Sequence, residues 1–211
     1  MLNALNESNL IFIGFMGSGK SSVGREISKR FNKLFLDVDS IIENREDMKI
    51  SDIFAKHGEI YFRDIERSCA KMVENSIHNS VISVGGGFPT AVQNLQDLGF
   101  VIYLDIDFDF MVSELSKYKD EIEKRPLMQN LDMARAIYDS RKDVYKSQAD
   151  LIIQIKQKNL NDVVDEVEKI LIKKIVNFTK GWFLKQHWLN RKFKLDLRVK
   201  HEDLFLVILK F

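Results

Sequence analysis

The residues GFMGSGKS, at positions 14–21, are the strongest indication of fold in this sequence. They match the pattern G-x-x-x-x-G-K-S/T in full, and an apolar run at 10–13 precedes them. Val23, Ile27 and Phe31 follow at a spacing of four, which is typical of one buried helix face. A glycine-rich loop between a strand and a helix can wrap its backbone N–H groups around phosphate oxygens. The stretch therefore predicts a nucleotide-binding loop.

Each part of this loop has an expected role. The glycines allow the backbone to curve, and the positive end of the following helix attracts phosphate. Lys20 is expected to reach the outer phosphates, and Ser21 to supply an oxygen to Mg²⁺. A full match would arise by chance in about one chain in a hundred of average composition, so nucleotide binding is the favoured interpretation.

Four further apolar runs predict strands that alternate with helical patterns. They lie at 34–36, 81–84, 101–104 and 151–155. Short strands that are nearly all apolar favour a parallel sheet covered by helices on both faces, an α/β fold. Ligands of such sheets bind beyond the carboxyl ends of the strands, so the residues that follow each strand are the candidates for chemistry.

Composition excludes several other classes. The 211 residues are 45% hydrophobic and 30% charged, as expected for one globular domain with or without an appendage. A formal charge of +1 gives no reason to expect nucleic acid or an anionic membrane as partner. The single cysteine excludes a disulfide framework and fits a reducing compartment. No signal peptide or membrane-spanning run is apparent, so we expect a cytoplasmic protein.

Two carboxylates follow the second predicted strand. The third strand ends in Gly85–Gly87 instead of the Asp that many nucleotide-binding proteins carry there, and no Asn-Lys-x-Asp guanine motif occurs. A carboxylate on the metal side must then come from Asp37 or Asp39. If strand geometry persists, alternation puts both on one side, one towards the metal and the other towards a hydroxyl acceptor. The alternatives are a solvated turn or a helix N-cap.

Two more features are candidates for binding the acceptor. Arg63 follows Gly58 at a junction between two helical patterns and stands beside Phe62, a core-facing position. Its alternative role is a surface ion pair with Asp64 or Glu66. Gly85–Gly87 permits very close approach of a ligand to the backbone. The alternative is a tight turn, although three consecutive glycines are more than a turn needs.

The sequence also predicts a mobile lid. Residues 116–128 are rich in charge and poor in apolar pattern, and they contain Arg125, which is expected to touch nucleotide phosphates on closure. On the next helix, Arg141 and Tyr145 are four residues apart. Arg141 can present its planar fork to a carboxylate, but taken singly each arginine also fits an ordinary surface role.

In this order, the motifs resemble those of the shikimate kinase family. They are GFMGSGKS, DVD at 37–39, GEIYFR at 58–63, GGG at 85–87, KRPLM at 124–128 and R-x-x-x-Y at 141–145. The resemblance runs from about residue 9 to about residue 175. It implies a P-loop NTPase fold of the nucleoside-monophosphate-kinase type, with a five-stranded parallel sheet, helices on both faces and a mobile lid. The implied reaction moves the γ-phosphoryl group of ATP to the 3-hydroxyl of shikimate, a step towards chorismate and the aromatic amino acids.

On the nucleotide side, the resemblance implies that one continuous stretch holds the ATP phosphates, namely Gly17, Ser18, Gly19, Lys20, Ser21 and Ser22. It also implies that Ser21 binds Mg²⁺ with assistance from Asp37, and that Arg125 of the lid reaches ATP. Lys20, Asp39 and Arg125 are then the catalytic residues.

On the acceptor side, the resemblance implies that Asp39 contacts the shikimate hydroxyls and that Arg63 and Arg141 clamp the carboxylate. Backbone at Gly85 and Gly86 is expected to contact a hydroxyl. The chain departs from the family where Asp143 replaces a frequent proline and where Phe88-Pro89 follows the triplet.

Two alternative functions compete with this interpretation. A gluconate or adenylate kinase on the same scaffold would keep the phosphate loop but would not require Arg63, Arg141 and the glycine triplet. The other is a nucleotide-binding regulator that has lost catalysis and acts through its tail, against which the intact set of Lys20, Ser21, Asp39 and Arg141 argues.

Residues 177–211 differ in composition from residues 1–176, the kinase-like domain. They contain both tryptophans and carry eight Lys/Arg against three Asp/Glu, a net +5, whereas residues 1–176 carry a net −4. Apolar and polar residues alternate from Phe193 to Val199, which predicts a strand that Leu204–Leu209 can pair with. The extension is a dock for a protein or membrane partner, a hairpin packed on the domain, or a frameshifted or read-through end. We expect it to be dispensable and the enzyme to be a monomer.

Overall fold

The structure is a computed structural model, and it describes residues 8–117, 126–156 and 158–193. For Pro126 and residues 177–193 only the backbone is described. Arg125 and most of the predicted lid therefore lie outside the described residues, as do residues 194–211, where most of the predicted terminal hairpin falls.

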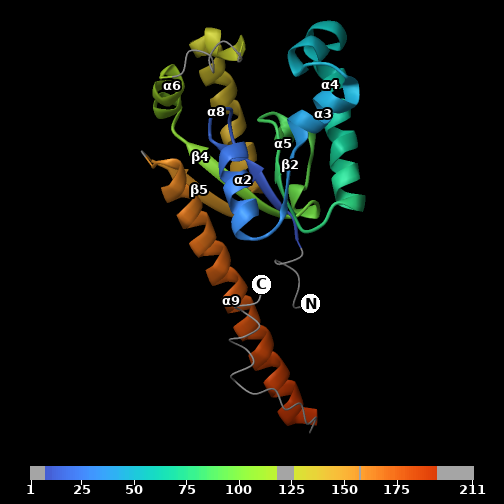
Figure 1. Cartoon of the computed structure of the whole chain (residues 1–211), viewed down its shortest axis with the longest axis vertical. Coiled ribbons are helices and arrows are strands. Elements are labelled where there is room, and N and C mark those ends of the chain that lie inside the picture. Colours follow the sequence, from blue (N-terminus) through green and yellow to red (C-terminus); the bar gives the residue numbers. More distant parts are fainter. Residues whose placement is uncertain (1–7, 118–125, 157, 194–211) are drawn as a thin grey trace.

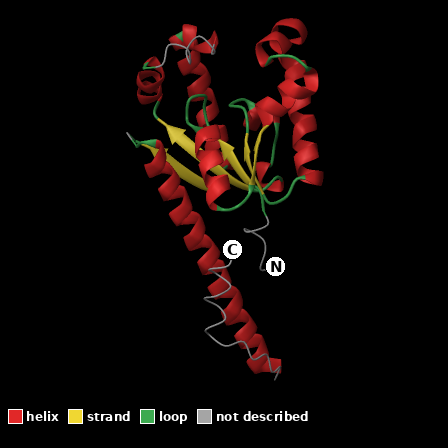
Figure 2. Cartoon of the chain, in the orientation of Figure 1, coloured by secondary structure: helices red, strands yellow, loops and turns green. Residues whose placement is uncertain are grey.

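A five-stranded parallel sheet forms the centre of the molecule (Figures 1 and 2). Its order is β2-β3-β1-β4-β5, and every neighbouring pair is parallel. The strands span Leu34–Asp37 (β2), Ser80–Ser83 (β3), Leu10–Ile13 (β1), Phe100–Ile106 (β4) and Leu151–Ile155 (β5). All four residues of β1 are buried, as expected for a central strand covered on both faces. The five predicted strands and their parallel arrangement are confirmed.

Helices cover both faces of this sheet. Helix α2 (Lys20–Arg30) packs on β1, β2 and β3 and against α9 (Leu160–Phe193). On the other face, α8 (Leu131–Gln148) packs on β4 and on the short α5 (Phe88–Ala91), as seen behind the sheet in Figure 1. Val23 and Ile27 of α2 are buried at the predicted spacing. One apolar core therefore unites the five strands with both helical layers.

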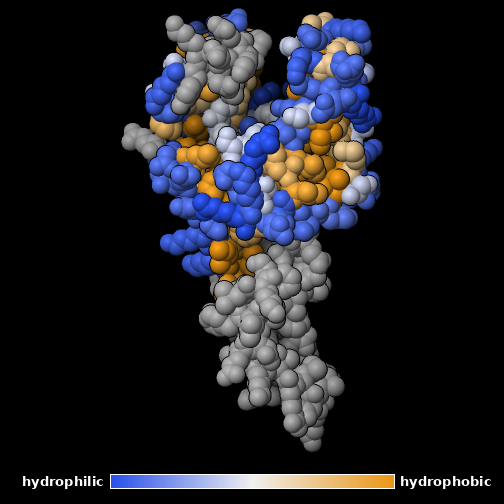
Figure 3. All heavy atoms as spheres, in the orientation of Figure 1, coloured by the Kyte–Doolittle hydropathy of each residue, from blue (hydrophilic) through white to orange (hydrophobic). Residues whose placement is uncertain are grey.

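A two-helix lobe rises beside the second strand. Helix α3 (Val38–Glu46) follows β2 directly and packs on α4 (Ile50–Ser76). Within α4 the backbone of Gly58 has φ 81° and ψ 175°, which is not helical, so the element is two helices joined at the predicted junction. Across the sheet edge from this lobe, α6 (Phe108–Ser116) ends shortly before the predicted lid residues that are not described, and a 3₁₀ turn (Pro126–Gln129) follows them. Figure 3 shows the surface hollowed beside the α3–α4 lobe.

The last helix is longer than the sequence pattern predicts. Helix α9 continues without interruption across residue 176 to Phe193, so the first part of the basic extension continues the final helix of the domain. Arg30 of α2 forms ion pairs with Asp165 and Glu168, which attach the first turns of α9 to the domain. Over the described ranges, no helix has the length and apolarity needed to cross a membrane.

Candidate active site

The phosphate loop connects β1 to α2 at the carboxyl edge of the sheet. Gly14, Gly17 and Gly19 have φ angles of 146°, 77° and 82°, a region that residues with a Cβ rarely adopt. A Cβ at Gly14 would also lie 2.7 Å from the backbone oxygen of Leu104 in the neighbouring strand. The glycines therefore have two functions, because they curve the loop and let it rest against β4.

Lys20 and the serines of the loop face different surroundings. The Lys20 Nζ donates to the backbone oxygen of Phe15 at 2.9 Å, so the ammonium lies across the loop that it is expected to serve. Ser22 is exposed on the first turn of α2. The side chain of Ser18 is buried and its Oγ has no hydrogen-bond partner among the described residues, so its hydroxyl lies below the loop surface.

A cluster of oxygens lies at the start of α2. The Ser21 hydroxyl donates to Asp37 Oδ2 at 2.7 Å and lies 3.1 Å from the Ser83 hydroxyl. Asp37 is also the N-cap of α3, where its Oδ1 accepts from the backbone N–H of Ser40. Asp37 thus connects the phosphate loop to the lobe formed by α3 and α4. The N-cap role expected as an alternative is also present, in the same side chain.

Asp39 lies within electrostatic reach of both Lys20 and Arg63. Burial and the nearby negative charge of Asp37 raise the pKa of Asp39 to about 6, while the cations of Lys20 and Arg63 act in the opposite direction. A Cβ on Gly85 would lie 2.6 Å from Asp39 Oδ1, so glycine lets the carboxylate lie directly against the backbone in this position. The two aspartates end up in one electrostatic environment although α3 has already begun at Val38.

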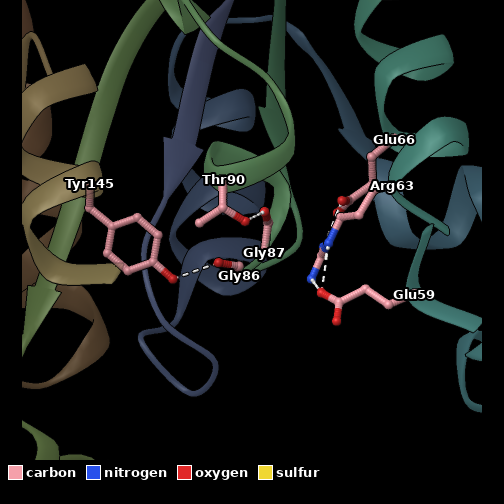
Figure 4. A network of polar contacts seen from close by, with 7 residues as sticks. All are labelled: Glu59, Arg63, Glu66, Gly86, Gly87, Thr90 and Tyr145. Carbon is pink, nitrogen blue, oxygen red and sulfur yellow. Dashed lines mark hydrogen bonds and ion pairs between the residues drawn. The ribbon is translucent and has the colours of Figure 1, made fainter. Parts of the chain in front are cut away.

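Arg63 is held between two carboxylates (Figure 4). Its Nη1 donates to Glu66 at 2.7 Å, and its Nε and Nη2 donate to one oxygen of Glu59 at 3.1 and 2.7 Å. Glu66 is 1% exposed, and its burial raises its pKa. The expected alternative of a surface pair is partly right, since Glu66 is a partner, but the pair is buried and Asp64 binds Arg67 instead.

The glycine triplet lies between Arg63 and α8. A Cβ on Gly87 would lie 2.6 Å from Arg63 Nη2, so the guanidinium rests directly on backbone. On the other side, the Tyr145 hydroxyl donates to the backbone oxygen of Gly86 at 2.6 Å (Figure 4). Glycine at position 87 thus lets the guanidinium lie against the backbone, whereas a Cβ on Gly86 would meet no atom closer than 3.5 Å.

Arg141 enters the same region from α8. Its positive charge acts on Tyr145 and on Glu66, which places it within electrostatic reach of the Arg63 cluster. The structure therefore brings together residues from four separate segments, namely Asp39, Arg63, the triplet and Arg141, beside the phosphate loop.

Two residues near the site, Ser83 and Glu59, were missed by the sequence analysis, whereas Glu66 is the ion-pair partner that it offered as an alternative. Ser83 ends β3 at the position where an Asp was sought, and its place at a strand end was the available signal. The functional surroundings of Arg63 depend on Glu59 and Glu66, which stand four residues before and three residues after it on one helical face.

Fold and site together define a class. A parallel sheet with a phosphate loop after its first strand, and an arginine- and aspartate-lined acceptor region beside it, is a small-molecule kinase of the P-loop type.

The comparisons identify the family within this class. The shikimate kinase family model matches residues 16–172. A shikimate kinase of Helicobacter hepaticus is 40% identical over 145 residues, covering 69% of this chain and 85% of that protein. The chain belongs to the shikimate kinase family. Its reaction is the transfer of the ATP γ-phosphoryl group to the 3-hydroxyl of shikimate.

Solved structures agree with this assignment. A shikimate kinase from Acinetobacter baumannii, determined in complex with shikimate, has a TM-score of 0.69 at 26% identity and covers 79% of this chain and 94% of its own. A gluconokinase from Sinorhizobium meliloti has a TM-score of 0.51 at 12% identity, covering 82% of this chain and 97% of its own. That second likeness shows a shared fold alone.

Replacing Asp39 by Asn should stabilise the protein at neutral pH. The folded-state pKa of about 6 exceeds the ordinary value of 3.8, so ionised Asp39 costs stability above pH 6, and this cost fades as pH falls towards 4. In urea unfolding at pH 7.5, we expect the free energy of unfolding of Asp39→Asn to exceed that of the parent by about 1–3 kcal/mol. The difference should disappear near pH 4.

Asp52→Asn, on the exposed start of α4, is the control and should change stability by less than about 0.5 kcal/mol at either pH. An Asp39→Asn protein that is less stable than the parent at pH 7.5 would contradict the assigned cause of the pKa shift.

Proposed function

We propose that the two halves of the site hold Mg·ATP and shikimate side by side. The observation that carries this proposal is the position of Asp39, which interacts electrostatically with Lys20 of the phosphate loop and with Arg63 of the acceptor region. Phosphoryl transfer depends mainly on alignment and on neutralisation of charge, so a shared carboxylate between the two halves suits this chemistry.

The nucleotide half would hold ATP on the backbone of Gly17–Ser22, with Lys20 on the outer phosphates. Ser21 and Asp37 would hold Mg²⁺, with Ser83 beside them, because all three present the hard oxygen atoms that Mg²⁺ prefers. Among the residues described, no group of three or more His, Cys, Asp or Glu could hold a metal, and Mg²⁺ commonly takes one or two carboxylates together with substrate phosphates. Bound Mg²⁺ supplies positive charge that neutralises the phosphates.

Arg125, outside the described residues, would complete this half from the lid. Its expected contact is with ATP phosphates after closure.

The acceptor half would orient shikimate by its carboxylate and hydroxyls. Arg63 and Arg141 are the proposed clamp for the carboxylate, and backbone at Gly85 and Gly86 would contact a hydroxyl. Asp39 would orient the attacking 3-hydroxyl and accept its proton, since a carboxyl with a pKa of about 6 is mainly ionised at neutral pH.

We further propose a cytoplasmic monomer that has no nucleic-acid partner, whose residues 177–211 are not needed for turnover. Support comes from the single cysteine, the near-neutral total charge and the end of the family match at residue 172.

The substrate assignment is tested by measuring ADP release from Mg·ATP with shikimate, gluconate or AMP as acceptor. We expect turnover with shikimate and loss of turnover when EDTA removes the metal. Turnover of gluconate or AMP without turnover of shikimate would overturn the proposal.

Arg63→Ala and Arg141→Ala should each weaken shikimate binding by about 1.5–3 kcal/mol, the value of a lost charge-assisted hydrogen-bonded pair. The affinity for ATP should be largely kept. Isothermal titration of each ligand measures both quantities. Arg67→Ala, four residues further along α4 and paired with Asp64 at the surface, is the matched control and should leave both affinities unchanged. Equal losses for ATP and shikimate would place the two arginines elsewhere in the mechanism.

A protein that ends at Val176 should retain shikimate turnover and a cooperative fold. The helical contacts of α2 with Asp165 and Glu168 remain in this truncation. Steady-state kinetics and circular dichroism measure both properties. Collapse of turnover in a still-folded truncation would show that residues 177–211 take part in function.

A further inference from the structure

Tyr145 is buried at the back of the glycine triplet and has no role in the proposed chemistry. Its side chain is fully buried and its hydroxyl donates to the backbone oxygen of Gly86 at 2.6 Å. Burial raises the pKa of Tyr145 to about 12, so the hydroxyl keeps its proton at neutral pH and remains a donor. A hydrogen bond from a buried side chain to a loop backbone fixes the orientation of that peptide.

The bond sets the direction of the next N–H group. The described backbone contains no cis peptide bond, so the carbonyl of Gly86 and the N–H of Gly87 point in opposite directions. Because the carbonyl points to Tyr145, the N–H of Gly87 points away from α8. Figure 4 places Tyr145 on one side of the triplet and Arg63 on the other.

The N–H groups are available for a ligand. Phe88 and Thr90 donate to the carbonyls of Gly85 and Gly87, which anchors the triplet to α5. Within the described residues, neither the N–H of Gly86 nor that of Gly87 donates a hydrogen bond. Two adjacent donors without an acceptor, next to a guanidinium, suit the oxygens of an anionic, hydroxylated acceptor.

A second side chain of α8 supports the same segment. Gln148 Nε2 donates to the backbone oxygen of Pro89 at 2.6 Å, three residues after Tyr145 on the helix. Arg141 lies four residues before Tyr145, so one helix carries a proposed substrate ligand and two contacts to the triplet segment. These two contacts tie the triplet segment to the helix that carries Arg141.

We propose that Tyr145 is a positioning residue for the acceptor substrate. Its hydroxyl orients the Gly86–Gly87 peptide so that the Gly87 N–H faces the acceptor as a further donor, beside the Gly85 and Gly86 backbone that is proposed to contact a hydroxyl. Tyr145 acts through backbone and touches neither substrate. The inference rests on the proposed placement of shikimate at the triplet.

The test is Tyr145→Phe in the full-length protein, which removes only the hydroxyl. We expect KM for shikimate to rise about five- to tenfold, as for one lost oriented hydrogen bond, with kcat and KM for ATP changed less than about twofold. Tyr138→Phe is the matched control. Tyr138 is also buried on α8, and its hydroxyl also donates to a backbone carbonyl, that of Ile106 at 2.8 Å.

Each of the two variants loses one buried hydrogen bond, so both should lower the unfolding temperature by a similar amount. Only Tyr145→Phe should change KM for shikimate, and Tyr138→Phe should leave it unchanged. A spectroscopic readout is independent of activity. With ¹⁵N-glycine labelling, the ten glycines of the chain give few amide signals, and those of Gly86 and Gly87 should shift in Tyr145→Phe and stay in place in Tyr138→Phe.

Three results would overturn the inference: an unchanged shikimate KM in Tyr145→Phe, equal changes in the two substrates' KM values, or the same kinetic change in both variants. If the parent protein turns over shikimate and one of these results is found, only the role of Tyr145 fails. If the parent does not turn over shikimate, the proposed function itself fails.

Discussion

Asp39 and Arg63 lie so close to glycine backbone that a Cβ at Gly85 or Gly87 would force their side chains to move. Asp39 occupies the space that a side chain on Gly85 would need, and the Arg63 guanidinium occupies that of Gly87. The same constraint applies in the nucleotide half, where Gly14 rests on the backbone of β4. The site is thus assembled by packing polar groups against bare backbone, and both halves depend on it.

This packing has an electrostatic consequence. Two aspartates lie at the end of β2, and one guanidinium lies between Glu59 and Glu66. Burial of Asp39 disfavours its ionised form, so the folded protein carries an unfavourable charge at neutral pH. The positive charges of Lys20, Arg63 and Arg141 act against this excess of negative charge.

Helix α9 relates the domain to its extension. Its first turns are tied to α2 through Arg30, and the family match ends at residue 172, yet the helix runs on to Phe193. A change in composition at residue 177 is consequently not a change in secondary structure, because helix propagation needs only continued backbone hydrogen bonding.

Local pattern predicted the phosphate loop and the five strands, because these features depend on spacing and residue type along a short stretch. Asp37 and Asp39 were candidates from their place after a strand, whereas Arg63 and Arg141 stood out only through the order of motifs that resembles the family. The contacts between them were decided only by tertiary structure. Ser21 meets Ser83 across 62 positions, and Tyr145 meets Gly86 across 59. Such pairs have no local signature, since strand order and helix packing bring them together. The sequence thus determined which groups were available for chemistry, and the parallel sheet, by gathering its strand ends at one edge, decided which of them meet.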